Sequence, residues 1–438
     1  MSLTLEKTDC VKCTSELAGL ESHSTAGAPR WLRSGIWALA DQGLFSGANF
    51  IANVLLADLL TPVEYGAFTV AFTTFLFLGT IHSALLTEPM LVFGPGRYSN
   101  NVVTYLRTLL WGHAAVSAAF GIILMGGGLL CRVLRMPSIG NALLCLALAQ
   151  PFILLLWLMR RACYIEPSPR RAASAGTLYL ILVVAGIVSL SKTGTLSVMS
   201  SLAVMACGSV VCAILIWVCL TAGQAEDPCG TTTRTVAAAH WGYGRWAAVT
   251  AVIGFMPGNI YYYVLPLFTG LAATAALKAM VNIALPVLLA SSALSSLLLP
   301  ALVRRRGTPA FARVVRFAVF GTAATLIAFW VAVGAFHSTI VAEVYRGRYL
   351  EASSLLWVIG AFPVVGGLSA VFATALRAEE NPRAVFNATL VAALVSMALG
   401  IPLAARSGIR GAAVGMAAYS AITAGVLWLQ SSRTRVAR

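Results

Sequence analysis

The chain has 438 residues, of which 59% are hydrophobic and only 10% are charged. An ordinary soluble domain carries roughly 25% charged residues, so this chain has too few charges to cover a large soluble surface. The net charge of +15 would suggest a nucleic-acid partner in a soluble protein. In a membrane protein, Arg and Lys mark the loops that stay in the cytoplasm. We therefore expect a membrane protein without a nucleic-acid partner.

Long apolar segments recur along the whole chain, and each is about as long as the 20 residues that a membrane-spanning helix needs. They are expected at 35–59, 66–93, 108–131, 140–162, 173–191, 195–221, 245–268, 272–302, 315–336, 352–376, 384–404 and 411–430. Because these runs are continuous rather than alternating, they favour helices over a β-barrel. The predicted fold class is an all-α polytopic membrane protein with about 12 transmembrane helices in two six-helix lobes.

The lobes are expected at 35–221 and 245–430, joined by a cytoplasmic linker at 222–244. An even number of spans places both termini on one side, and about three times as many Lys and Arg residues fall on that side as on the other. This bias predicts that both termini are cytoplasmic, with tails at 1–34 and 431–438.

The N-terminal tail is polar and has no apolar core, so it does not have the pattern of a secretory signal peptide and is expected to be disordered. It holds Cys10 and Cys13 as an isolated C-x-x-C motif. A structural zinc site needs four ligands, and no second pair lies nearby. We therefore expect neither a metal nor a cofactor.

Two helices repeat one pattern. Asn49, Val54 and Leu55 in the first span recur as Asn259, Val264 and Leu265 in the seventh. Chance similarity between apolar helices is the alternative explanation. A true repeat would relate the lobes by a pseudo-twofold axis, with the site between them near the bilayer midplane.

Polar side chains within the spans are the candidate site residues, because polar groups are costly in hydrocarbon. Gln42, Ser46, Asn49 and Asn53 recur at helical spacing in the first span and share one face. This stripe either lines a polar cavity or binds a neighbouring helix through hydrogen bonds. Asp41 lies off the stripe, about two turns from the cytoplasmic end, and is a candidate for ion coupling.

The second span carries a polar face that includes Thr80 and Ser83. His82 titrates near neutral pH when unperturbed, which makes it a candidate for ion coupling. An interior histidine whose hydrogen bonds are satisfied is the alternative. Glu88 precedes Pro89 near the predicted cytoplasmic exit. It is a third candidate for coupling, unless it is simply hydrated at the interface.

Lys278 is the one Lys or Arg that falls firmly within a predicted span. At the bilayer centre a cation costs roughly 2.5–3.5 kcal/mol on insertion scales. Near a helix end it can instead extend to the interface. Asn282 shares its face, and the seventh span adds Asn259, Tyr262 and Tyr263. These residues complete the predicted substrate cavity.

Motifs of soluble catalysis are absent from the sequence. It contains no G-x-x-x-x-G-K-[ST] and no H-E-x-x-H, and the connections between spans are too short for a catalytic domain. We therefore expect a transporter or a scaffold rather than an enzyme.

A family resemblance rests on the run Asp41–Phe50 and on the turn Thr61-Pro-x-Glu-Tyr-Gly-x-Phe68. Met256–Asn259, Leu297–Leu302, Tyr349–Ala352, Ala375–Ala378 and Gly408–Ala413 extend it to the last third of the chain. Together these motifs resemble the bacterial polysaccharide (O-antigen-type) flippase family of the multidrug/oligosaccharidyl-lipid/polysaccharide exporter superfamily.

The resemblance implies a MATE-like exporter fold in the bacterial inner membrane. It implies a polyprenyl-diphosphate-linked oligosaccharide as substrate, moved to the outer leaflet by alternating access for polysaccharide biosynthesis. Membrane lipid surrounds such a protein, and a polysaccharide polymerase or glycosyltransferases are candidate partners. One alternative is a cation-coupled multidrug or metabolite antiporter of the same superfamily, with Asp41 as the coupling carboxylate. A second is a non-transporting scaffold for glycan assembly.

Overall fold

The computed structural model describes residues 30–165, 168–222 and 233–436, and helices account for nearly all of them. No β-strand occurs in these ranges. The all-α prediction is therefore confirmed for the described chain. Cys10 and Cys13 lie outside the described residues.

The N-terminal lobe contains the first six spans. Its elements are α2 (Arg30–Leu59), α3 (Pro62–His82), the π-helical turn η1 (Ser83–Thr87), α4 (Glu88–Arg97), the 3₁₀ turn η2 (Ser99–Asn101), α5 (Val102–Val133), α6 (Pro137–Ala162), α7 (Pro169–Lys192) and α8 (Val198–Thr221).

The C-terminal lobe contains the rest. Its elements are α9 (Thr233–Asn259), α10 (Tyr261–Phe268), α11 (Leu271–Val303), α12 (Pro309–Ala335), α13 (His337–Tyr345), the 3₁₀ turn η3 (Leu350–Leu355), α14 (Leu356–Ile359), α15 (Ala361–Ala378) and α16 (Pro382–Val436).

Nine helical stretches of the described chain are long and apolar enough to cross a membrane, or ten if the bent pair α9 and α10 is one span. The last stretch, α16, holds two spans, because its backbone leaves the helical conformation at Gly408, where φ is 57°. Gly400 and Gly415 then lie so close together that a Cβ on either would clash with the other. With the less apolar α2 and both halves of α16 counted, the described chain has the predicted twelve helical segments.

The turn between the first two spans explains the sequence of the Thr61–Phe68 motif. Thr61 is the N-cap of α3, and Pro62 follows at a position that needs no backbone donor. The Thr61 hydroxyl and the Glu64 backbone form one hydrogen bond of 3.3 Å, and the Glu64 carboxylate accepts from the Thr61 backbone at 3.1 Å. Gly66 packs directly on the carbonyl of Leu271 in α11, with no room for a side chain. The motif therefore starts a helix and brings the two lobes together.

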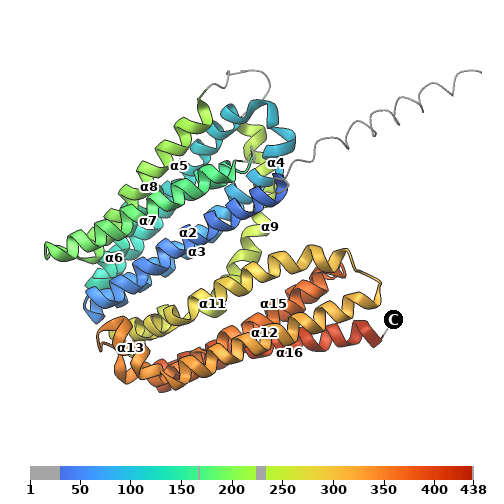
Figure 1. Ribbon diagram of the computed structural model, residues 1–438. Coiled ribbons are helices and arrows are strands. Elements are labelled where there is room, and N and C mark those ends of the chain that lie inside the picture. Colours follow the sequence, from blue (N-terminus) through green and yellow to red (C-terminus); the bar gives the residue numbers. More distant parts are fainter. Residues whose placement is uncertain (1–29, 166–167, 223–232, 437–438) are drawn as a thin grey trace, which may run out of the picture.

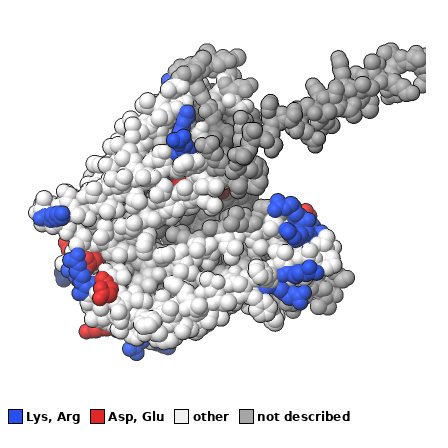
Figure 2. Space-filling model, viewed as in Figure 1, with Lys and Arg blue, Asp and Glu red and all other residues white. Residues whose placement is uncertain are grey.

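The two lobes meet at one end and diverge toward the other (Figure 1). They meet where the α2–α3 turn lies beside α13, and they diverge toward the end that holds α4 and the C-terminus. Helix α9 crosses between them. Arg and Lys gather at the diverging end of the C-terminal lobe, whereas acidic and basic residues mix at the end where the lobes meet (Figure 2).

Three helices extend beyond the predicted apolar spans. Helix α2 begins at Arg30, inside the predicted tail 1–34, and α16 continues to Val436, inside the tail 431–438. Helix α9 begins at Thr233, so more than half of the predicted linker 222–244 is helical. In each case the hydrogen-bonded helix extends beyond the apolar segment, because charged and aromatic side chains continue a helix into the interface.

The repeat also has a structural counterpart. Asn49 in α2 donates to the carbonyl of Phe45 at 3.1 Å, and Asn259 in α9 donates to the carbonyl of Phe255 at 2.9 Å. The first helix of each lobe therefore contains the same side-chain contact. The two helices then differ, because α9 bends by 45° into α10.

Candidate substrate cavity

A cavity of about 340 Å³ lies between the lobes. Most of its wall comes from α2, α3, η1 and α6, and α11 closes it from the second lobe. The residues that line it are Gln42, Phe45, Ser46, Asn49, Phe50, Asn53, Phe72, Leu76, Ser83, Thr87, Trp157, Arg160, Arg161, Lys278 and Leu285.

The four polar residues predicted as a stripe on the first span all line this cavity. Gln42 donates to Ser46 at 3.2 Å, and Asn53 donates to the carbonyl of Asn49 at 2.9 Å. In the described chain these four side chains hydrogen-bond only within α2, so they do not hold a neighbouring helix. The buried Asn53 Oδ1 has no partner there. Both observations favour the cavity-lining interpretation.

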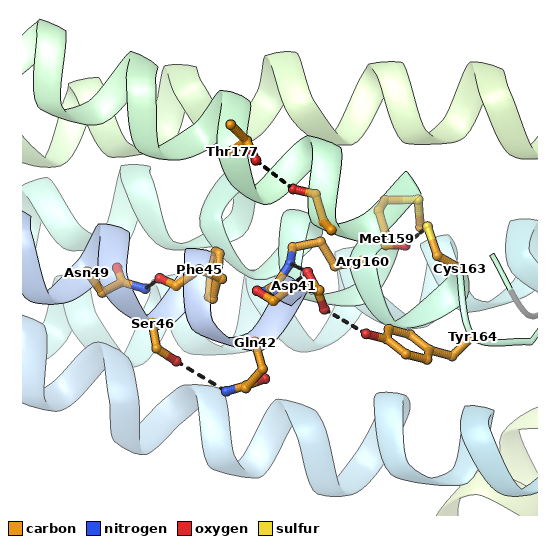
Figure 3. Close-up of polar contacts among 11 residues, drawn as sticks. Asp41, Gln42, Phe45, Ser46, Asn49, Met159, Arg160, Cys163, Tyr164 and Thr177 are labelled. Carbon is orange, nitrogen blue, oxygen red and sulfur yellow. Dashed lines mark hydrogen bonds and ion pairs between the residues drawn. The ribbon is translucent and has the colours of Figure 1, made fainter. Parts of the chain in front are cut away.

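Asp41 lies at one end of the stripe and is held by a buried ion pair (Figure 3). Arg160 of α6 donates to its Oδ1 from Nη2 at 2.6 Å and from Nε at 3.0 Å. Tyr164 donates to Oδ2 at 2.9 Å. Every carboxylate oxygen therefore has a donor in this conformation, and a coupling cation would have to displace Arg160. Ion coupling by Asp41 remains a prediction.

The guanidinium of Arg160 also stacks on Phe45, 3.7 Å from the ring centroid. One planar group thus binds the carboxylate and covers the aromatic floor of the cavity. The sequence analysis did not predict this contact. The only signal for it in the sequence was Asp41, because a carboxylate within a span needs a partner.

Lys278 lies in α11, where its side chain is buried rather than extended to the interface. Its amino group lies 5.4 Å from the centroid of the Tyr262 ring, within the range of a cation–π interaction. Within the described chain it forms no ion pair. Arg161, which also lines the cavity, is exposed and likewise forms none there. The two residues leave the cavity with unbalanced positive charge.

The remaining predicted residues divide into two groups. Ser83 lines the cavity. Five others do not: Thr80, Asn259, Tyr262, Tyr263 and Asn282. Thr80 and Asn259 bond to carbonyls of their own helices. Glu88 is exposed on α4, and His82 is fully buried beside the cavity wall.

Contacts between the lobes close the cavity on the side away from the N-terminus. Asn282 of α11 donates to the hydroxyl of Tyr65 in α3 at 2.9 Å. Beyond this bond, Arg348 donates to the carbonyl of Leu60 at 2.5 Å, and Tyr349 donates to that of Ala57 at 3.2 Å. The last two bonds cap the final carbonyls of α2, where the helix dipole favours a cation. We call the three bonds together the end seal.

Replacing Arg348 with alanine should loosen the end seal. Because Arg348 is exposed, the bond is expected to contribute only about 1 kcal/mol, which changes the population of open molecules about fivefold. Hydrogen–deuterium exchange of residues 57–66 in nanodiscs should therefore become faster. The control is Arg406→Ala, an exposed arginine on the same side. Equal exchange in both variants would contradict the role of Arg348.

Comparison with known proteins places this fold. No family model matches the sequence, and no curated protein matches it. The fold is shared with solved multi-pass membrane transporters, among them two transporters of the MOP superfamily.

Two solved structures illustrate the likeness. A multidrug resistance MATE family transporter in its inward-facing conformation is 15% identical, with 90% of this chain and 94% of that chain covered and a TM-score of 0.75. The lipid II flippase MurJ in an inward closed conformation is 14% identical, with 91% and 87% covered and a TM-score of 0.74.

An outward-facing MATE family transporter gives a lower TM-score of 0.65, at 14% identity and with 93% and 95% covered. The described chain therefore superposes better on the two inward structures, in agreement with lobes that are sealed at only one end.

Proposed function

We propose that this protein is a flippase that moves a polyprenyl-diphosphate-linked oligosaccharide from the cytoplasmic to the outer leaflet of a bacterial inner membrane. The observation that carries the proposal is the cavity between the lobes. It joins two unbalanced cations, Arg161 and Lys278, to a stripe of amide and hydroxyl groups on α2. A diphosphate needs the cations, and sugar hydroxyls need the polar stripe.

The orientation follows from the cations. If the arginine-rich ends of the helices face the cytoplasm, the lobes are sealed toward the outside and diverge toward the cytoplasm. Both termini are then cytoplasmic. The headgroup of the substrate would enter the cavity from the inner leaflet, while the apolar tail stays in the surrounding lipid. Enzymes that build or polymerise the glycan would act before and after this step.

The alternative, a cation-coupled multidrug or metabolite antiporter, shares the same fold. Two observations weigh against it. No carboxylate is among the residues that line the cavity, and Asp41 behind the wall is neutralised by Arg160. A cationic drug would meet Arg161 and Lys278 without a counter-charge. A scaffold that transports nothing would not need a charged cavity, which costs stability in a membrane.

Deletion of the gene in its host tests the proposal. Lipid-linked glycan should accumulate on the inner leaflet, and surface polysaccharide should be lost. Re-expression of the wild-type chain should restore both. Intact glycan export together with reduced resistance to cationic dyes would support the antiporter instead. No change in either would favour the scaffold.

A further inference from the structure

Two buried histidines contact each other behind the cavity wall. His82 is the last residue of α3, and His113 lies in the middle of α5. The Nε2 atom of His82 is 3.0 Å from the Nδ1 atom of His113. The two residues are 0% and 7% exposed. We call this pair the histidine dyad.

The contacts of the dyad leave one ring nitrogen without a partner. The Nδ1 atom of His113 lies 3.0 Å from Nε2 of His82 and 3.5 Å from the hydroxyl of Ser117. Because one proton lies between the two rings, one ring donates and the other accepts. The Nδ1 atom of His82 is buried without a partner in the described chain. When His82 donates from Nε2, its Nδ1 atom carries a lone pair that can accept a further proton.

The groups around the dyad give that proton no counter-charge. On α9, His240 is engaged by the hydroxyl of Tyr105 at 2.8 Å and by the carbonyl of Leu85 at 3.1 Å. On α6, the amide of Gln150 donates to the carbonyl of Ser117, and Arg160 is bound to Asp41. Glu64, at the other end of α3, is half-buried and accepts from the Thr61 hydroxyl. The other charged groups on the helices packed against the dyad are exposed: Glu88, Arg97, Arg107, Arg132, Arg161, Arg234 and Arg245.

Within the described chain, no carboxylate therefore forms an ion pair with either ring. A charged imidazolium in this dry site would lose its hydration without gaining a partner. The conformation described here consequently favours the uncharged dyad.

The dyad is connected both to the cavity and to the second lobe. The π-helical turn η1 starts directly after His82, and its residues Ser83 and Thr87 line the cavity. The same turn contacts α9, because Leu85 accepts from His240 and Gly244 packs against the Ala84 carbonyl without room for a side chain. Single π-helical turns occur frequently at functional sites. A change at His82 can thus reach the cavity wall and the helix that crosses between the lobes.

We propose that the histidine dyad is the proton-binding site that couples this transporter to a pH gradient, and that the conformation described here is its proton-free state. One proton adds to Nδ1 of His82, and no other bond is made or broken. Because this conformation disfavours the charge, acid should shift the population toward conformations that hydrate the dyad. A proton taken up from the outside would then be released when the lobes return to this state.

The conformational effect can be measured without any substrate. The full chain, with its native cysteines replaced by serine, is spin-labelled at Lys192→Cys and Arg406→Cys, one on each lobe, and placed in nanodiscs. On acidification from about pH 7.5 to 5.5, one unit to either side of the usual histidine pKa, the population with a longer distance should rise severalfold. His82→Gln should abolish this rise.

His240→Gln is the matched control, since it removes another buried histidine that contacts η1, and it should keep the rise. No rise in the wild-type background would overturn the proposal. An unchanged rise in His82→Gln would also overturn it.

A second measurement uses the wild-type histidines and does not depend on whether a variant folds. The chain has five histidines, so solid-state NMR of the ¹⁵N-histidine-labelled protein can follow their ring nitrogens. One nitrogen of the dyad should change from unprotonated to protonated over the pH range in which the lobes move. A dyad that stays neutral throughout that range would refute the site.

The coupling role rests on the proposed transport function, but the two can fail separately. If glycan export proves unrelated to this protein while the dyad still titrates with the movement of the lobes, the substrate is wrong and the proton site stands. If export depends on the protein but the dyad does not titrate, the function stands and the proton site is wrong.

Discussion

Replacing Arg160 with methionine should lower the free energy of unfolding by about 3–5 kcal/mol, which is typical when one partner of a buried ion pair is removed. The reason is that the Asp41 carboxyl group would stay buried after losing both donors from Arg160. Methionine fills a similar volume, so most of the loss should come from the charge. Thermal unfolding of the purified protein in detergent measures it.

Arg161→Met is the matched control, because this neighbour is exposed and forms no ion pair in the described chain. We expect a change within about 0.5 kcal/mol there, as for most surface substitutions. The double variant Asp41→Leu with Arg160→Met should recover much of the stability, since it removes both charges at once. Equal destabilisation by the two single arginine variants would show that the ion pair does not stabilise the fold.

The fold could be predicted because the sequence pattern that specifies each helix lies within one segment. Each span needs only a long apolar run, and the stripe on α2 needs only a helical period, both of which can be read within one segment. The motif at Thr61 and Glu64 is local too, since a capping box involves residues three apart. The helix ends were less predictable, as in the linker, because a helix does not stop where apolar residues stop.

The parts of the site that could not be predicted depend on contacts between segments distant in the sequence. Arg160 and Asp41 are 119 positions apart, and the histidines of the dyad are 31 apart. In the sequence, Arg160 and Arg161 look alike, as two cations at the end of a span. Only the packing of α6 against α2 decides that one is buried and the other exposed. Side-chain direction within a span is likewise set by packing, which is why Thr80 and Asn259 do not line the cavity.

Lys278 should be the cavity residue on which transport depends most directly. If its amino group binds the diphosphate, Lys278→Met removes a charge-assisted interaction of about 1.5–3 kcal/mol. The rate of glycan export at limiting substrate should then fall about ten- to a hundredfold. Complementation of the deletion strain, with surface polysaccharide and protein abundance measured together, gives this number.

Two variants separate charge from packing at this position. Lys278→Arg keeps the charge and should retain part of the export, whereas a loss equal to that of Lys278→Met would point to shape instead. Lys192→Met removes the other lysine of the described chain, which is exposed at the end of α7, and should leave export unchanged. Full export by Lys278→Met would mean that this buried cation does not bind the substrate. The anion site would then have to lie at Arg161, the other unbalanced cation of the cavity.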